Sequence, residues 1–193
     1  MSKYLPQLQQ FLSSFSELNA KEWAYISQNV QLLDFEKKSY LSQIGDKIEH
    51  IDYIIEGSVR MYFVTEDKRD ISINFSFSNQ LIHDFCLSSK SKISEFHVQA
   101  LTPTKVFRLA EKHHIYLNKT FDTYQKRRTA MLGKELSDKM KREKNLLSLN
   151  AEQNYLKVCA DSPEIIRFIP VKDIASYLGI HPESLSRIRK NMA

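Results

Sequence analysis

Apolar and polar residues follow three different patterns along this chain, and the first is helical. Two short helices are expected before residue 31, one from Leu5 to about Phe15 and one beginning after Asn19. Asn19 is a favourable N-cap residue, and Glu22 follows it at the spacing of a capping box. Three apolar residues then recur at helical intervals: Trp23, Ile26 and Val30.

Residues 31–110 carry the short-period pattern of β-strands. Two β-rich runs meet at Gly57, and a polar turn over 65–70 precedes a strictly alternating segment that predicts a half-buried strand. Two more runs flank the turn at Pro103. The expected strands are 51–56, 58–64, 71–77, 96–101 and 105–109. Several short strands at regular spacing predict a small antiparallel barrel or roll.

The third pattern begins after Ala110, where strand signals stop and one long helix is expected over residues 111–147. Arg128 interrupts its apolar stripe, and Gly133 costs roughly 1 kcal/mol relative to alanine inside a helix. Because most of the helix is polar, the stripe must pack against the roll of its own chain or against a second copy; we favour the second copy. The stripe consists of Leu117, Phe121, Tyr124, Leu132, Leu136 and Met140.

Residues 171–190 have the pattern of a helix-turn-helix. Gly179 stands where the turn needs a residue that tolerates positive φ, and Ala175 is small where the two helices must approach closely. Pro182 suits the first turn of the second helix. The shared apolar core would consist of Ile174, Leu178, Ile180, Leu185 and Ile188.

The outer face of the second helix, around 182–191, carries the side chains that DNA reading needs. Arginine can donate two hydrogen bonds to guanine, a carboxylate can accept one from cytosine, and serine or lysine can contact phosphate. A hairpin used only for packing is the alternative, but it leaves the basic outer face unexplained. The candidate DNA-binding residues are Lys172, His181, Glu183, Ser184, Ser186, Arg187, Arg189 and Lys190.

Charge adds to this picture when it is divided along the chain. The 193 residues include 28 Lys and Arg against 23 Asp and Glu, a net charge of +5, and 42% hydrophobic residues, which argues against disorder. Residues 1–110 hold 12 of the cations and 13 of the anions, so the excess lies entirely in residues 111–193, at +6. Such a basic part suits a polyanionic partner, although a solvated Lys-rich helix explains the charge equally well.

These motifs together resemble the Crp/Fnr family of bacterial transcription regulators over nearly the whole chain. The segments similar to the family's first roll strands are Ile44-Gly45-Asp46 and 53–60, and those similar to its DNA-reading motif are 173–175, 178–179 and 183–188. The resemblance implies an α+β fold with three parts. An antiparallel β-roll of the cyclic-nucleotide-binding (jelly-roll) type with flanking helices spans 1–110, a long dimerisation helix spans 111–147, and a helix-turn-helix domain spans 148–193.

The resemblance also implies a function. The chain would be a homodimer that reads a pseudo-palindromic operator in double-stranded DNA, with Glu183 and Arg187 reading bases and Ser184 contacting phosphate. RNA polymerase is a further candidate partner. The alternative is a ligand-sensing or protein-interaction module whose helix-turn-helix no longer binds DNA.

One departure from the family concerns cyclic AMP. The family's cyclic-nucleotide binders carry a Gly-Glu pair and an arginine that hold the ribose and the cyclic phosphate, whereas residues 81–96 contain neither glycine nor arginine. Lysines offer only point charges there, a weaker arrangement than a guanidinium fork. We therefore expect no dependence on cyclic AMP and leave an unidentified small-molecule effector open. The candidate pocket residues are His83, Asp84, Lys90 and Lys92.

Other chemistry finds little support in the sequence. His83, Asp84 and Cys86 match no common zinc pattern, and Cys86 and Cys159 have no C-x-x-C partner, so no metal, cofactor or disulfide is expected. No nucleophile elbow occurs, so the chain is not expected to be an enzyme. Neither an 18-residue apolar run nor a signal-like block occurs, so a cytoplasmic protein without membrane contact is expected.

Overall fold

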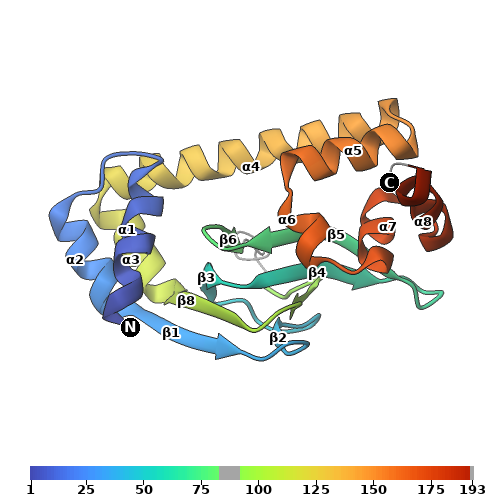
Figure 1. Ribbon diagram of the computed structural model, residues 1–193. Helices are drawn as coiled ribbons and strands as arrows, with labels where there is room; N and C mark the ends of the chain where they lie inside the picture. Colours follow the sequence, from blue (N-terminus) through green and yellow to red (C-terminus); the bar gives the residue numbers. More distant parts are fainter. Residues whose placement is uncertain (83–91, 192–193) are drawn as a thin grey trace.

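The computed structural model describes residues 1–82 and 92–191. A two-sheet roll carries helices at one end, a long helix runs along it, and a helical C-terminal unit lies at the other end (Figure 1). The N-terminal helices are η1 (Ser2–Tyr4), α1 (Leu5–Ser13) and α2 (Ala20–Asn29). The later helices are α3 (Glu111–Thr120), α4 (Asp122–Ser148), α5 (Ala151–Asp161), α6 (Glu164–Phe168), α7 (Val171–Leu178) and α8 (Pro182–Asn191).

The roll consists of two four-stranded antiparallel sheets, ordered β1-β8-β3-β6 and β2-β7-β4-β5. The five predicted strands are confirmed as β3, β4, β5, β7 and β8, and Gly57 separates β3 from β4 as expected. Apolar side chains from both sheets, among them Ile54, Val59 and Val106, fill the space between them. The strands are β1 (Val30–Phe35), β2 (Tyr40–Ser42), β3 (His50–Glu56), β4 (Ser58–Val64), β5 (Asp70–Phe77), β6 (Leu81–Ile82), β7 (His97–Ala100) and β8 (Thr104–Ala110).

Strand β5 changes the face that it buries. The register with β4 shifts at Met61 and Tyr62, which pair with Asn74 and Ser72, so Ile73 is an extra residue on β5. Such a bulge disturbs the simple alternation of side chains. Ile73 packs into the roll, whereas Phe75 and Phe77 pack against the C-terminal helices. The roll and the C-terminal unit are therefore joined by an apolar contact.

The single helix expected over 111–147 is wrong, because the chain forms two helices, α3 and α4, with a break at Phe121. Phe121 has extended backbone angles (φ −127°, ψ 113°) and packs against the apolar cluster beneath the N-terminal helices. The predicted stripe is consequently divided between two surroundings. Leu117 is fully buried in that cluster, whereas Leu136 and Met140 on α4 are 62% and 63% exposed.

A buried ion pair attaches the N-terminal helices to α4. Asn19 caps α2 as predicted, accepting a hydrogen bond from the Lys21 amide, but Glu22 does not complete a capping box. Its carboxylate instead bonds Arg127, and the Thr123 hydroxyl donates to it at 2.6 Å. Arg127 also donates to the carbonyls of Leu12 and Glu17, so this buried charge is well satisfied.

None of the helices among the described residues is both long and apolar enough to cross a lipid bilayer.

Candidate nucleic-acid interface

The predicted helix-turn-helix consists of α7 and α8, whose core is the predicted one. Ala175 and Leu185 are fully buried where the helices meet, and Ile174 and Leu178 are nearly so. Ile180 and Ile188 pack at the edge of the same cluster. Tyr155 on α5, Ile165 on α6 and Ile169 directly after α6 enlarge this core.

The turn between the two helices has the geometry that the glycine predicts. Gly179 takes the left-handed conformation (φ +70°, ψ 27°) directly after α7. Its amide donates to the Ser176 carbonyl and the Ile180 amide donates to the Ala175 carbonyl, the two hydrogen bonds of a Schellman motif. Pro182 then begins α8, where its missing amide hydrogen costs nothing.

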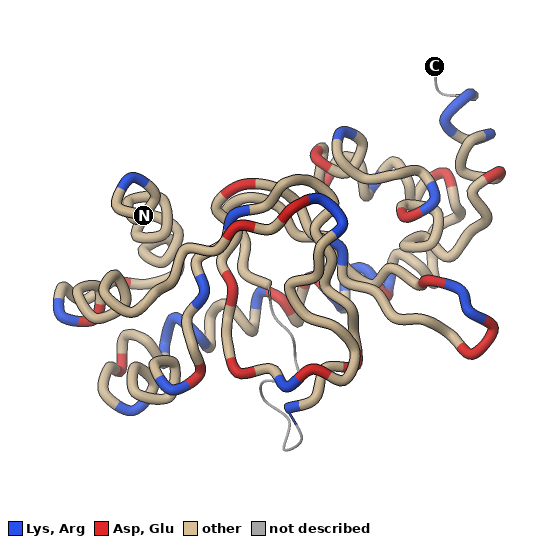
Figure 2. Tube along the Cα trace, turned by 90° about the horizontal axis from the view of Figure 1, so that it is seen from below, with Lys and Arg blue, Asp and Glu red and all other residues tan. Residues whose placement is uncertain are grey.

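Helix α8 presents most of the predicted DNA-binding residues to solvent. Leu185 faces the core, so residues near the opposite side of the helix point outward. Glu183, Ser186, Arg187 and Lys190 are exposed, as are His181 before the helix and Lys172 on α7, whereas Ser184 is half-buried. Lys and Arg recur along α8 toward the C-terminal end of the chain (Figure 2).

The basic side chains Lys172, Arg187 and Lys190 on this face are not neutralised by other side chains of the described residues. Over residues 1–82 and 92–191, Lys172, Arg187 and Lys190 form no ion pair. Long cations that remain unpaired at the surface can contact phosphates or base edges without first breaking a bond.

Arg189 differs from the other basic residues of α8. It is half-buried, and its charge acts on Tyr155 and Cys159 of α5, where it opposes the upward shift that burial gives to both pKa values. Arg189 therefore lies at the flank of the outer face rather than at its centre.

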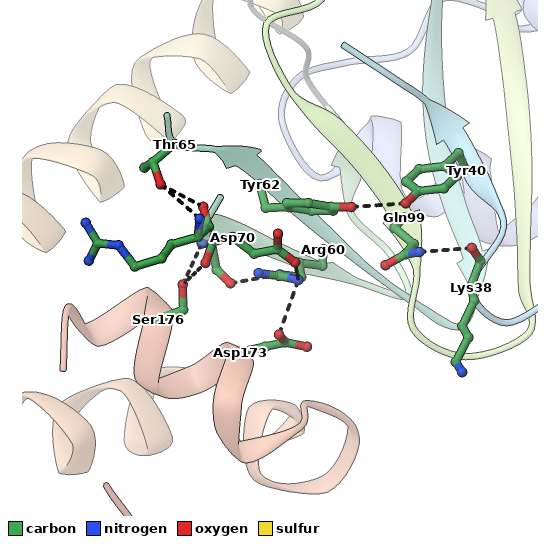
Figure 3. A network of polar contacts seen from close by, with 11 residues as sticks. Lys38, Tyr40, Arg60, Tyr62, Thr65, Asp70, Gln99, Asp173 and Ser176 are labelled. Atoms are coloured by element: carbon green, nitrogen blue, oxygen red, sulfur yellow. Dashed lines mark hydrogen bonds and ion pairs between the residues drawn. The ribbon is translucent and has the colours of Figure 1, made fainter. Parts of the chain in front are cut away.

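The helix-turn-helix is attached to the roll and to α4 by polar contacts. The Ser176 hydroxyl donates to the Asp70 carbonyl (2.7 Å) and accepts from the Ser72 amide (3.0 Å), so α7 bonds the free edge of β5 (Figure 3). From α4, Arg142 donates to the Tyr177 carbonyl (2.8 Å) and lies 4.1 Å from the centre of the Tyr177 ring. The sequence carries no local signal for these long-range contacts.

The predicted effector pocket falls largely outside the described residues, which do not include His83, Asp84, Lys90 or Cys86. The fourth pocket residue, Lys92, forms an ion pair with Glu111 at the start of α3 (2.5 Å). Inside the roll, Arg108 bonds both carboxylate oxygens of Asp52 (2.8 and 2.6 Å).

A separate apolar cavity of about 100 Å³ lies between the N-terminal helices, the first sheet and α4. Its polar lining includes His114, whose Nδ1 is 2.7 Å from the Tyr124 hydroxyl. In the part of the chain that the structure describes, no group of three or more His, Cys, Asp and Glu is arranged to hold a metal ion.

Comparisons with known proteins agree with this architecture. Residues 32–117 match the cyclic nucleotide-binding domain family. A search among curated proteins found no match.

Several solved structures have a similar fold. CLP, the c-di-GMP-responsive global regulator of Xanthomonas campestris, is 17% identical with a TM-score of 0.70, over 90% of this chain and 91% of that one. FixK2 from Bradyrhizobium japonicum is 18% identical with a TM-score of 0.71, over 84% of each chain. A protein from Eubacterium rectale assigned to the Crp/Fnr regulators is 16% identical with a TM-score of 0.71, over 90% and 83%. The predicted fold class, a cyclic-nucleotide-binding-type roll followed by helices in the Crp/Fnr arrangement, is confirmed.

Proposed function

We propose that this chain is a DNA-binding transcription regulator of the Crp/Fnr type that acts in the cytoplasm as a homodimer. The observation that carries the proposal is the outer face of α8, where Arg187 and Lys190 are exposed and unpaired among the described residues, above a buried helix-turn-helix core. In this proposal Arg187 and Glu183 read bases, and Ser184, Ser186, Lys190 and Lys172 contact phosphates.

The exposed side of α4 supports the homodimer. Leu136, Met140 and Leu147 are 62%, 63% and 83% exposed, which is costly for large apolar side chains on a monomer. Together with Thr129, Gly133 and Glu143 they recur at alternating steps of four and three residues, the spacing of a coiled-coil seam. A parallel pair of α4 helices would bury these six residues, which we call the α4 seam.

The polar contacts of the roll support regulation without cyclic AMP. A cyclic phosphate needs a free guanidinium or free backbone amides, and the Arg108 guanidinium is already neutralised by Asp52. Lys92 is likewise paired, with Glu111. CLP responds to c-di-GMP, so this fold is compatible with effectors other than cyclic AMP. An unidentified effector of this chain and a contact with RNA polymerase stay within the proposal.

The experiment that tests DNA binding is a salt-dependent titration. A binding sequence is first selected from random duplexes, and fluorescence anisotropy is then measured with the wild-type chain and Arg187→Ala. We expect the logarithm of the binding constant to fall with the logarithm of salt by roughly 0.9 per phosphate neutralised. If Arg187 reads guanine, its removal should cost about 1–3 kcal/mol at one base position.

The matched control is Arg69→Ala, an arginine that is exposed on the β4–β5 turn and pairs with Asp67. This variant should bind DNA like the wild type. A wild-type chain that selects no sequence and binds no duplex at low salt would contradict the proposal and favour a module whose helix-turn-helix does not bind DNA.

A further inference from the structure

Arg60 lies on the outer face of the roll, at the point where β5 meets α7 (Figure 3). Its neighbours on β4, Val59 and Met61, pack into the roll interior, so the alternation of a strand turns Arg60 outward. An arginine on the outer face of a sheet would ordinarily be solvated, yet only 3% of Arg60 is exposed. The C-terminal helices cover it.

The guanidinium of Arg60 joins the roll to the first helix of the helix-turn-helix. Its Nη1 lies 3.2 Å from Asp173 Oδ1 on α7 and 3.4 Å from Asp70 Oδ2 at the start of β5, and its Nε donates to the Ser72 hydroxyl at 2.8 Å. Asp173 is itself only 4% exposed. Burial raises the pKa of Asp173, and the charge of Arg60 opposes that shift.

The roll determines where this guanidinium points. Arg60 lies 4.2 Å from the centre of the Tyr62 ring on the same strand, and the Tyr62 hydroxyl is 3.1 Å from that of Tyr40 on β2 (Figure 3). Tyr62 is buried as well. A row of polar contacts therefore crosses the outer face of the second sheet and ends at α7.

The contact is better suited to fixing an orientation than to adding stability. Arg60 Nη2 is buried and has no hydrogen-bond partner among the described residues, and a buried cation with an unsatisfied donor is costly. The apolar contact of Phe75 and Phe77 with the C-terminal helices supplies attraction without requiring one particular angle. An ion pair between two buried groups, in contrast, forms only at one particular angle between α7 and the roll.

We propose that Arg60 is a positioning residue for DNA reading, because through Asp173 it sets the angle of α7, and hence of α8, relative to the roll. The inference rests on the proposed function. Helices α7 and α8 share a tightly packed core, so α8 must follow any rotation of α7. Two reading helices of a dimer bind DNA more tightly when their orientation is fixed beforehand, since no ordering remains to be done on binding.

The test needs a readout of docking that does not depend on DNA, and the Ser72 amide provides one. It donates to the Ser176 hydroxyl across the interface, so its hydrogen-exchange rate reports whether α7 is docked on β5. In Arg60→Met we expect exchange at Ser72 to accelerate by about 10-fold or more and DNA affinity to fall by about 10-fold, within the usual range of coupling between sites. The salt dependence should stay that of the wild type, because Arg60 contacts no phosphate in this proposal.

Arg69→Met on the same β-hairpin is the matched control and should change neither readout. Asp173→Asn provides a second variant if Arg60→Met does not fold, and the double variant should be no weaker than the worse single one, since both changes remove the same pair.

Unchanged exchange at Ser72, or faster exchange with unchanged DNA affinity, would overturn the positioning role. A wild-type chain that binds no DNA would overturn the proposed function and this role with it, whereas the exchange measurement would still establish whether Arg60 holds α7 on β5.

Discussion

Single buried polar residues fix much of this fold, and they show where a sequence stops being informative. Glu22 occupies the correct position for a capping box, yet its fully buried carboxylate bonds Arg127 on a distant helix. The periodicity of apolar residues predicted the helix correctly because that signal is local. The partner of Glu22 depends on how α4 crosses the N-terminal helices, which no spacing within 19–30 encodes.

Gly57 gives the first prediction at the residue scale. Its φ is +101°, and a Cβ atom there would lie 2.5 Å from Thr104 Oγ1 and 2.6 Å from the Pro103 carbonyl oxygen. We expect Gly57→Ala to lower the free energy of unfolding by more than about 3 kcal/mol, from backbone strain and overpacking together. Gly45→Ala is the control, with φ +92° and open space around the position, and should cost only about 1 kcal/mol. Urea unfolding measures both variants, and an equal loss of unfolding free energy in Gly57→Ala and Gly45→Ala would contradict the steric argument.

His114 gives a pH-dependent prediction. Its burial, together with the nearby charge of Arg128, lowers its pKa to about 4. The unfolded chain takes up a proton at this residue near pH 6.5, whereas the folded chain does so only near pH 4, so the free energy of unfolding should fall as pH decreases through that window.

The measurement is urea unfolding of the wild type and of His114→Gln at pH 7 and pH 5. The loss of stability between the two pH values should be smaller in the variant by about 1–2 kcal/mol. His181→Gln replaces an exposed histidine and should leave the difference as in the wild type. An identical pH dependence in wild type and His114→Gln would show that His114 does not contribute.

At the scale of elements, the helix-turn-helix was predictable and the packing between elements was not. Gly179, Pro182 and the apolar positions of α7 and α8 act over a few residues, so their pattern predicts both helices and their common core. The break at Phe121 and the bulge at Ile73 depend instead on contacts between distant segments. For the same reason, the sequence alone does not identify Arg60 and Asp173 as site residues.

Helix α4 gives the prediction at this scale. Leu136→Lys combined with Met140→Lys places two charges on the proposed α4 seam. We expect this variant to be a monomer with unchanged helical content, because neither side chain is part of the core of its own protomer. Analytical ultracentrifugation measures the mass of the particle in solution, and circular dichroism measures the helical content.

Leu156→Lys combined with Ile166→Lys provides the control, since these apolar residues are 45% and 49% exposed and belong to α5 and α6 rather than to α4. This control should remain dimeric. A dimer that survives the α4 changes would exclude the seam as the interface.

At the scale of the whole molecule, the position of α8 suits the proposed dimer through α4. Helix α8 lies beyond the C-terminal end of α4, at the opposite end of the molecule from α1 and α2 (Figure 1). A two-fold axis parallel to α4 would therefore bring both reading helices to the same end of the dimer. Such a pair suits two major grooves on one side of the duplex, about 34 Å apart.

This geometry predicts how the proposed dimer responds to operator spacing. Five base pairs inserted between the half-sites of a selected operator rotate one half-site by about half a helical turn, so a rigid dimer can engage only one of them. We expect the affinity to fall by about 100-fold, the loss that accompanies conversion of bivalent to monovalent binding. Fluorescence anisotropy titration with the selected operator and with the operator that carries the insertion measures this change in affinity.

The seam variant with Leu136→Lys and Met140→Lys is the matched control, because a monomer should bind both duplexes equally and as weakly as the dimer binds the altered one. If the insertion leaves the affinity of the wild type unchanged, the two helix-turn-helix units of the dimer move independently of each other. In that case Arg60 and Asp173 hold each helix-turn-helix on its own roll but do not fix one unit relative to the other. The flexible joint would then be the contact between the two α4 helices rather than the contact of α7 with β5.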